Sequence, residues 1–424
     1  MKILAVYPYV PFPLDRGAYH RAFHLLKGLS QEHDVDLIAL AENGVGQEHA
    51  DVFKEFCRNV CVVPFQHPQW QKLIPDRLRN PLPSTIEHWD IPALDHAIAD
   101  AVSKESYDAA HVFDIVMARP FLQKFRRIPL VADRTRVDLQ YQLMEQRRMK
   151  FSFKTQLLNL ENMAKMWRYE KAIARHAAMQ IVCGPDDLTF LRRYVTKSQP
   201  VEVIANGVDL EFFKPNAAYG SKERQPTVLF CGAMDYNPNV DGLRWYFAEM
   251  HKQIADAMPG LKMWIVGKDP VPEVKAYAKI PNVIVTGGVP DVRPYYQKAW
   301  LQVVPIRIGG GTRLKIVESL AMGTPVVSTT MGAQGLDLQH GDDALLADTE
   351  FDFIGETLRG LRDTDLRQRL VRQGQATVAA RLSWDGLSAC LRKIYADRFG
   401  LANNSGITTS RKSTPQKVPA LQNA

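Results

Sequence analysis

The sequence predicts an α/β protein built from two doubly wound domains that face each other across a central crevice. Short apolar runs alternate with amphipathic stretches along most of the 424 residues, and this alternation is typical of parallel sheets covered by helices on both faces. A chain of this length exceeds what one hydrophobic core usually supports, so two domains are expected. A loop-like polar stretch near the middle separates two similar halves.

Each half is a strand–helix repeat. In the first half the apolar runs predict strands at 2–7, 34–40, 60–65, 109–113, 128–133 and 177–184, with helices at 21–30 and 93–103. In the second half they predict strands at 227–232, 262–267, 282–287, 301–305 and 324–329. Helices are expected there at 241–258, 272–279, 292–299 and 312–322. Each half can therefore form a parallel sheet of its own.

The boundary between the halves is expected within residues 203–227, which carry Asn, Gly and Pro and end in a charged run. We place the linker near Lys214–Gln225. Residues 1–205 then form an N-terminal domain and residues 206–383 a C-terminal domain. A last helix at 384–400 could cross back to the N-terminal domain, and the polar tail 401–424 is expected to be disordered.

Composition places the chain among ordinary globular proteins. Lys and Arg number 53 against 46 Asp and Glu, so the net charge is +7. That excess suits anionic small molecules, a membrane surface or nucleic acid about equally well. The five cysteines form no C-x-x-C pair, which argues against a disulfide framework or zinc and favours a cytoplasmic protein. The opening MKILAVYPYVPFP is too short and too interrupted by proline for a signal peptide or a membrane helix.

Three glycines, Gly309–Gly311, lie between an expected strand and an expected helix, at the sheet edge where open α/β sheets bind ligands. Such a turn brings backbone N–H groups and a helix N-terminus towards an anion. Arg313 and Lys315 fall in the first helical turn, where the helix dipole disfavours cations, so a bound anion is indicated. Glu318, one turn further on, could hold the two hydroxyls of a ribose.

This loop predicts a pyrophosphate site. The structural alternative is a packing turn with an ordinary Lys315–Glu318 surface pair. The G-x-G-x-x-G pattern of dinucleotide enzymes is absent after the first strand, which disfavours a nicotinamide or flavin cofactor.

The segments GGGTRLKIVESLAMGTPVVST, NGVDLEFFKP and YPYVPFPLDRGAYHRAFHLLKGLS resemble retaining glycosyltransferases of family 4, which have the GT-B fold. The resemblance extends over nearly all of residues 1–400. It implies transfer of a sugar, with its anomeric configuration kept, from a nucleotide-diphosphate donor on the C-terminal domain to a saccharide or lipid-linked acceptor on the N-terminal one. Surface-polysaccharide assembly is the usual setting for such a resemblance. No separate cofactor is expected, and no nucleic-acid partner, because only residues 134–175 could supply a basic face with interleaved aromatic residues.

The resemblance also assigns residues. Glu318 would hold the donor ribose, the backbone around Thr312 the diphosphate, and the turn at Gly288 and Val289 the nucleobase. Gly17, beside Arg16, would close over the phosphate from the other domain; a plain turn glycine and a solvated charge are the alternatives. The expected donor-site residues are Arg16, Gly17, Gly288, Val289, Arg307, Gly309, Gly310, Gly311, Thr312, Arg313, Lys315 and Glu318.

The sequence departs from the family pattern in three places. The first of two glutamates in the C-terminal motif is replaced by Gly310, and no basic residue follows the strand at 227–232 until Arg244. Phosphate charge would then be neutralised by Arg313 and Lys315, with Arg307. In the N-terminal domain, His111 keeps the first position of an H-x-H pattern whose second position is Phe113.

The expected catalytic residues are His111, Asp114 and Arg313. A core histidine and a helix cap are the alternatives for the first two. Asn237 and Asn239 either line the cleft or cap a helix. No carboxylate stands out as a nucleophile and no acidic pair suggests a metal, so a metal-independent front-face displacement is favoured.

Residues 134–175 form a basic amphipathic region in which Arg147, Arg148, Lys150 and Lys154 alternate with Met149, Phe151 and Phe153. It either rests on an anionic membrane surface on the cytoplasmic side or forms a solvated helix pair. Two rival functions remain open: a sugar-nucleotide epimerase of the same fold, and a sugar-nucleotide-binding protein without catalysis.

Overall fold

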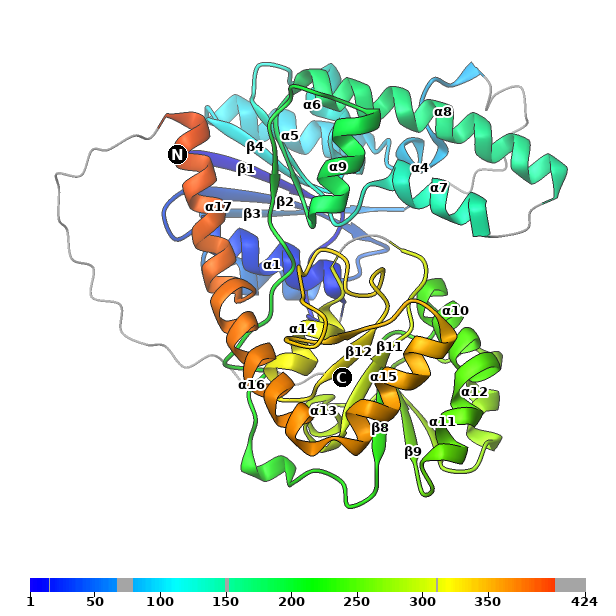
Figure 1. Cartoon of the computed structure of the whole chain (residues 1–424). Helices are drawn as coiled ribbons and strands as arrows, with labels where there is room; N and C mark the ends of the chain where they lie inside the picture. Colours follow the sequence, from blue (N-terminus) through cyan, green and yellow to red (C-terminus); the bar gives the residue numbers. More distant parts are fainter. Residues whose placement is uncertain (15, 67–78, 149–151, 310–311, 401–424) are drawn as a thin grey trace.

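The computed structural model describes residues 1–14, 16–66, 79–148, 152–309 and 312–400. Two α/β domains face each other, with the N-terminal domain at the top of Figure 1 and the C-terminal domain at the bottom. The predicted fold class is confirmed. Gly310, Gly311 and the tail from residue 401 lie outside the described residues, as do Met149, Lys150 and Phe151 of the basic region.

The N-terminal domain is a parallel seven-stranded sheet in the order β3-β2-β1-β4-β5-β6-β7. Successive residues of β1 point to opposite faces: Leu4 packs with the helices on one side, and Ile3 packs with α1 and α17 on the other. Its strands are β1 Lys2–Tyr7, β2 Asp34–Glu42, β3 Asn59–Phe65, β4 Ala109–Phe113, β5 Leu130–Asp133, β6 Ala177–Val182 and β7 Val201–Val203. Its helices are α1 Gly17–Leu29, α2 Ala50–Lys54, α4 Ser84–Glu87, α5 Pro92–Lys104, α6 Arg119–Gln123, α7 Asp138–Arg148, α8 Phe153–His176 and α9 Pro185–Tyr194.

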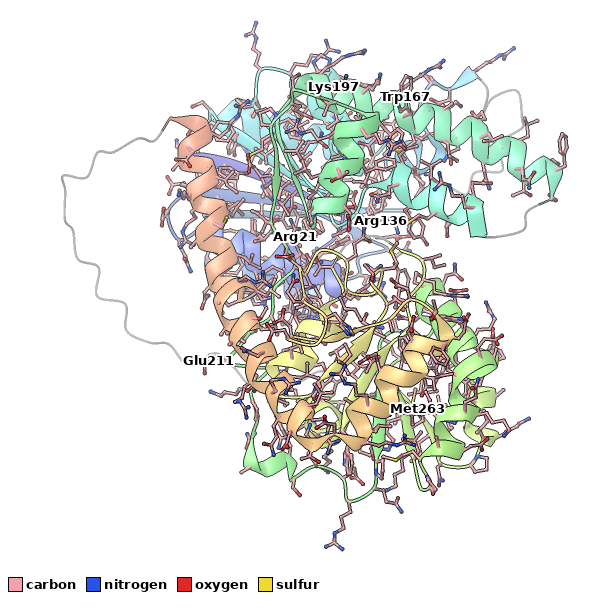
Figure 2. All side chains as sticks on the ribbon, viewed as in Figure 1. Arg21, Arg136, Trp167, Lys197, Glu211 and Met263 are labelled. Carbon is pink, nitrogen blue, oxygen red and sulfur yellow. The ribbon has the colours of Figure 1, made fainter. Side chains whose placement is uncertain are left out.

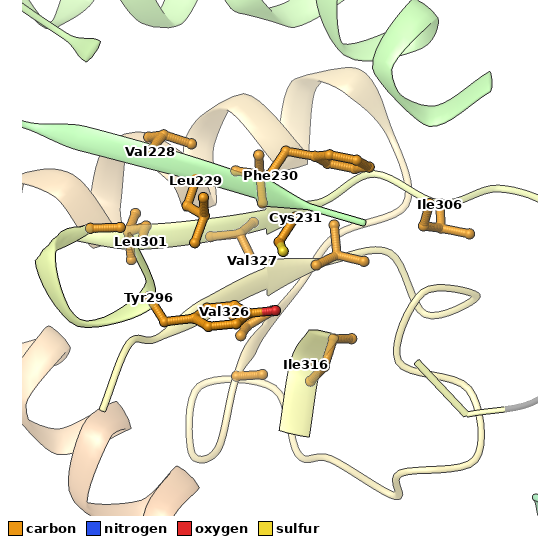
Figure 3. Close-up of a cluster of buried hydrophobic side chains, with 14 of the residues drawn as sticks. Val228, Leu229, Phe230, Cys231, Tyr296, Leu301, Ile306, Ile316, Val326 and Val327 are labelled. Atoms are coloured by element: carbon orange, nitrogen blue, oxygen red, sulfur yellow. The ribbon is translucent and has the colours of Figure 1, made fainter. Parts of the chain in front are cut away.

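The C-terminal domain is a parallel six-stranded sheet in the order β10-β9-β8-β11-β12-β13. Figure 3 shows apolar side chains of its central strands packed against Tyr296 and Ile316. Its strands are β8 Thr227–Cys231, β9 Lys262–Val266, β10 Val283–Gly287, β11 Leu301–Val304, β12 Val326–Ser328 and β13 Leu345–Leu346. Its helices are α10 Asn237–Trp245, α11 His251–Ala257, α12 Pro272–Ala276, α13 Arg293–Lys298, α14 Leu314–Ala321, α15 Glu350–Arg362 and α16 Thr364–Arg381.

The last helix, α17 (Trp384–Phe399), packs on the N-terminal domain, and α16 and α17 run along the left side of Figure 1 from one domain to the other. Ser388 Oγ donates to the carbonyl of His24 in α1 at 3.2 Å, and the rings of His24 and Trp384 stack at 5.1 Å. Tyr395 reaches the core beneath α1. The N-terminal domain is therefore assembled from two separate stretches of the chain.

The chain passes between the domains twice, and the two crossings lie side by side. Val208 N donates to Leu382 O at 2.8 Å, and Trp384 N donates to Val208 O at 3.2 Å. The predicted linker at Lys214–Gln225 is wrong, because this stretch packs on the C-terminal domain. Lys222 Nζ, for example, donates to Ala299 O at 2.7 Å and to Thr324 Oγ1 at 2.8 Å.

Candidate functional site at the domain interface

In each sheet the strand order reverses next to its first strand, between β1 and β4 in one domain and between β8 and β11 in the other. Parallel sheets bind ligands outside the carboxyl ends of strands at such points. The loops that follow these strands face each other. A Cβ on Gly17, at the start of α1, would lie 3.3 Å from Leu314 Cδ1, at the start of α14.

Thr312 ties the glycine loop to the N-terminal domain. Its hydroxyl donates to the carbonyl of Cys183 at 3.2 Å and accepts from the backbone N–H of Asn206 at 3.3 Å. The side chain of Asn206 is held in turn by Arg21, whose guanidinium donates to Asn206 Oδ1 at 3.1 Å and pairs with Asp133 at 2.6 Å. Figure 2 places Arg21 close to the junction of the two domains. Thr312 is thus anchored through a buried polar network.

Glu318 lies one turn into α14, where its Oε2 accepts a hydrogen bond from the hydroxyl of Tyr296 at 2.8 Å. Burial raises the pKa of Glu318 to about 7, and the bond from Tyr296 and the charge of Lys315 oppose this rise only in part. The two oxygens of this carboxylate can accept hydrogen bonds from two adjacent hydroxyls.

Lys315 lies within the C-terminal domain close to the end of β8. Its Nζ donates to Asn239 Oδ1 at 2.7 Å and lies 4.3 Å from the centre of the Phe230 ring. Burial lowers its pKa to about 7, helped by the nearby charge of Arg313. A Cβ on Gly232, where φ is +149°, would lie 2.7 Å from this amine, so only glycine leaves room for it.

The two asparagines of α10 differ in role. Asn239 lies inside the helix, whose cap position is Tyr236; its amide nitrogen donates to Ala233 O at 2.7 Å while its oxygen orients Lys315. Asn237 is the first residue of the helix. Asn239 is therefore a positioning residue for the lysine rather than a helix cap.

Arg313 is 9% exposed and precedes the first residue of α14. Its guanidinium rests on Gly309, where φ is +122° and a Cβ would lie 2.9 Å from Nη2. Burial lowers the pKa of Arg313, and the neighbouring Tyr236 and Asp187 oppose that shift. Arg313 and Lys315 bring two cations to the N-terminal turn of α14, and no acidic residue lies in that turn.

Arg307 does not join this pair. Its guanidinium makes two hydrogen bonds to the carboxylate of Asp241, at 2.8 and 3.2 Å, and lies 4.9 Å from the Trp245 ring. The expectation that Arg307 neutralises donor phosphate stays a prediction, and its guanidinium already has a carboxylate partner within the C-terminal domain.

The predicted nucleobase turn follows β10 at the same sheet edge. Gly267 N, after β9, donates to Gly287 O at 3.1 Å, and Gly288 and Val289 follow directly. Gly288 is exposed, and Val289 is partly buried against the core. Arg16 is the residue just before α1 and Gly17 its first residue, so both border the domain interface.

His111 lies in the core rather than in the cleft. Its side chain is fully buried, with Nδ1 at 2.7 Å from the Tyr395 hydroxyl and Nε2 at 3.8 Å from Asp133 Oδ2. Burial lowers its pKa to about 4, only partly opposed by Asp133. This placement favours the core-histidine alternative, because the ring is fully buried and joins β4 to α17.

Asp114 follows β4 and adopts φ +67°, a strained backbone for a non-glycine residue. Its Oδ1 accepts from the N–H of Ile115 at 2.7 Å, as the helix-cap alternative requires. Burial and the charge of Asp138 raise its pKa to about 7, while Arg136 and Arg134 oppose the rise. Asp114 thus stands at the carboxyl edge of the sheet with its pKa raised above the usual range of a carboxyl group.

Three further side chains at this interface were not predicted. Arg136 follows β5, Asp187 follows β6 and Tyr236 follows β8. Figure 2 shows Arg136 on the side of its domain that faces the other one. Asp187 is buried, and burial raises its pKa to about 6 while Arg134 and Arg313 lower it. All three stand just beyond the carboxyl end of a parallel strand, and that position was the signal available in the sequence.

Within the described residues, no three His, Cys, Asp or Glu side chains converge as they would around a metal ion. No helix of the described part of the chain combines the length and the apolar character needed to cross a bilayer.

Solved structures with the same two-domain architecture resemble the chain closely in fold. The sucrose-phosphate synthase of Thermosynechococcus elongatus superposes with a TM-score of 0.72 at 20% identity, over 95% of this chain and 100% of that one. HepE of Anabaena in complex with UDP gives 0.64 at 16% identity, over 94% and 100%. TarM gives 0.65 at 11% identity, over 94% and 99%.

Two family sequence models match the chain. The one described as Glycosyltransferase Family 4 matches residues 16–212, and the one described as Glycosyl transferases group 1 matches residues 225–363. The chain belongs to the GT-B glycosyltransferases. The resemblance drawn from the sequence is thereby confirmed for the family and the fold.

Curated relatives of this GT-B glycosyltransferase share only part of their length with it. An uncharacterized 44.6 kDa protein in the cps region of Klebsiella pneumoniae is 27% identical over 131 residues, 29% of this chain and 34% of that protein. A GDP-mannose-dependent alpha-(1-6)-phosphatidylinositol monomannoside mannosyltransferase of Mycobacterium tuberculosis is 25% identical over 250 residues, 52% of this chain and 64% of that protein.

Proposed function

We propose that the protein is a retaining glycosyltransferase that moves a sugar from a nucleotide-diphosphate donor to a saccharide or lipid-linked acceptor. The observation that carries the proposal is the start of α14, where Arg313 and Lys315 lie near each other and Glu318 follows one turn on. Two cations that have lost water of hydration are stabilised by the negative charge of a bound diphosphate. The carboxylate one turn away is placed to accept hydrogen bonds from the hydroxyls of the adjacent ribose. Structures of similar fold that contain UDP support this choice of donor.

In the proposed reaction the bond between the anomeric carbon and the phosphate oxygen breaks, and its electron pair stays on the diphosphate. Arg313 and Lys315 stabilise the negative charge that develops there, and one such contact commonly contributes about 3 kcal/mol. The acceptor hydroxyl bonds to the same face of the sugar and passes its proton to the departing phosphate oxygen. These side chains can supply the neutralising charge without a metal ion, so we propose a metal-independent reaction in surface-polysaccharide or glycoconjugate synthesis.

Replacing Glu318 tests the donor site. Glu318→Ala removes the group that would hold the ribose, so affinity for the matching nucleoside diphosphate should fall at least about tenfold, whereas pyrophosphate should bind nearly as before. Thermal shifts with UDP, GDP and their sugar conjugates measure both effects and identify the nucleobase.

Glu249→Ala, on an exposed position of the same domain, is the matched control. It should change neither the affinity for the nucleoside diphosphate nor the affinity for pyrophosphate. Unaltered nucleotide affinity in Glu318→Ala would refute the assignment. Release of an epimerised sugar nucleotide, instead of transfer to an acceptor, would favour the epimerase alternative.

For the acceptor side, we propose that the N-terminal domain rests on an anionic membrane surface. Along α8, Phe153, Leu157, Leu160 and Trp167 are 84, 61, 58 and 40% exposed and recur at helical spacing; we call them the α8 stripe. Lys154, Arg168 and Lys171 flank the stripe, and Lys171 Nζ lies 4.1 Å from the Trp167 ring. An apolar stripe bordered by cations suits a lipid surface that carries negative charge.

Phe153→Glu should greatly reduce co-sedimentation with phosphatidylglycerol vesicles, because it places a charge where the ring would enter the lipid. Phe351→Glu is the matched control, since Phe351 is equally exposed, at 85%, on the C-terminal domain. Failure of the unmodified protein to bind these vesicles, or equal loss in both variants, would contradict the membrane proposal.

A further inference from the structure

Tyr296 belongs to α13 and reaches across to α14. Its ring is fully buried in the core of the C-terminal domain, and Figure 3 shows the hydroxyl end of the ring directed towards the side of α14. The hydroxyl donates to Oε2 of Glu318 at 2.8 Å. A buried tyrosine hydroxyl without a partner would be costly, so this bond restrains both side chains.

Tyr296 is itself held at both ends. Its backbone carbonyl accepts a hydrogen bond from the hydroxyl of Thr324, which follows the end of α14. At the other end of the side chain, the thiol of Cys231, the last residue of β8, interacts with the tyrosine hydroxyl. The hydroxyl therefore has a fixed place beside the carboxylate.

The bond from Tyr296 occupies one carboxylate oxygen of Glu318 and leaves the other free. Glu318 is only partly buried, and its Oε1 accepts no hydrogen bond from the described residues. A carboxylate oxygen has room for further donors. With Oε2 held by the tyrosine, Oε1 is the oxygen that a ribose hydroxyl can reach.

The same bond affects the charge of Glu318. Burial raises the pKa of Glu318 to about 7, and the bond from Tyr296 opposes that rise. The other titratable groups that face the carboxylate are Lys315, on its own helix, and Cys231. The charge of Lys315 also lowers the pKa of Glu318, whereas burial raises the pKa of Cys231 to about 11, so the thiol stays neutral near pH 7. Tyr296 thus helps to keep the carboxylate ionised.

We propose that Tyr296 is a positioning residue of the donor site, which holds Glu318 so that its free oxygen faces the ribose. The proposal rests on the proposed function, and it makes recognition of the ribose a property of two residues from two helices. Tyr296 does not contact the nucleotide itself.

The test compares a nucleoside diphosphate with its 2′,3′-dideoxy analogue. The two ligands differ only in the ribose hydroxyls, so the ratio of their affinities cancels the contributions of the diphosphate and of Arg313 and Lys315. Calorimetry with UDP, GDP and both analogues between pH 6 and 9 gives this ratio. In the unmodified protein the ratio should be about tenfold or more at pH 8. It should fall towards pH 6 as Glu318 becomes protonated.

Tyr296→Phe keeps the buried ring and removes only the hydroxyl. The ratio at pH 8 should fall about fivefold, because the carboxylate is no longer held. The pH at which the ratio rises should move upwards, because the bond that lowers the pKa of Glu318 is lost. A role of Tyr296 in packing alone would not move this pH.

Tyr246→Phe is the matched control. Tyr246 is also fully buried in the C-terminal domain, but its hydroxyl has no hydrogen-bond partner among the described residues, so the ratio and its pH dependence should not change. Equal affinity of the unmodified protein for both ligands would contradict the ribose role of Glu318 and overturn this proposal with it. Normal discrimination in the unmodified protein, with the same ratio and pH profile in Tyr296→Phe, would overturn the role of Tyr296 alone.

Discussion

The amine of Lys315 combines a lowered pKa with a position at the proposed diphosphate site. A buried amine with a pKa lowered to about 7 is charged at pH 6 and mostly neutral at pH 8. Its amine contacts the amide oxygen of Asn239 and the Phe230 ring, neither of which carries a negative charge. A diphosphate would supply that charge and would therefore raise the pKa of the amine.

Pyrophosphate binding at pH 8 should consequently take up protons, whereas binding at pH 6 should take up far fewer, because the amine is already charged there. Calorimetry in two buffers of different ionisation enthalpy measures this uptake. In Lys315→Met the proton uptake at pH 8 should fall by roughly half a proton or more. Pyrophosphate can itself change protonation on binding, but this contribution is common to both proteins and cancels when their uptakes are subtracted. Lys252→Met, on the surface, is the control. An unchanged uptake in Lys315→Met would exclude the amine as the group that titrates.

At the scale of elements, the contact between α1 and α17 depends on a glycine. A Cβ on Gly28 would lie 2.3 Å from Ser388 Cβ, far inside contact distance, so only a hydrogen there lets the helices approach. Gly28→Ala should lower the free energy of unfolding by about 1–3 kcal/mol. Gly355→Ala, in α15 with nothing near its Cβ, should instead raise it by about 0.5–1 kcal/mol. Urea unfolding of both variants measures these changes; equal effects would mean that the helix contact is unimportant.

The elements were largely predictable, because buried parallel strands appear as short apolar runs. Two short edge strands were not predicted, β7 (Val201–Val203) and β13 (Leu345–Leu346), because they are too brief to show a periodic pattern. Within the site, the sequence placed Arg313, Lys315 and Glu318 on one helix start because their spacing is local. It could not show that Arg307 pairs with Asp241, since that pair joins residues far apart in the chain.

At the scale of the whole molecule, the N-terminal domain depends on the far end of the chain. Trp384, Leu391 and Tyr395 of α17 belong to one of its hydrophobic clusters, together with Ile3 and Leu25. A chain that ends at residue 383 should therefore lose protection against hydrogen exchange in β1 and β4, while β8 and β11 keep theirs. A chain that ends at Gly400 retains all of α17 and serves as the control. Full protection of β1 in the shorter chain would show that α17 is dispensable.

The two adjacent crossings at Val208 and Ser383 also set the order in which the protein can be completed during synthesis. The ribosome releases residues 1–205 first, but α17, which covers one face of their sheet together with α1, emerges only after the whole second domain. Until then Ile3, Leu25 and their neighbours in that cluster expose apolar surface to the cell. A nascent chain that stops short of α17 should therefore expose part of this cluster, which is the kind of apolar surface that leads to aggregation.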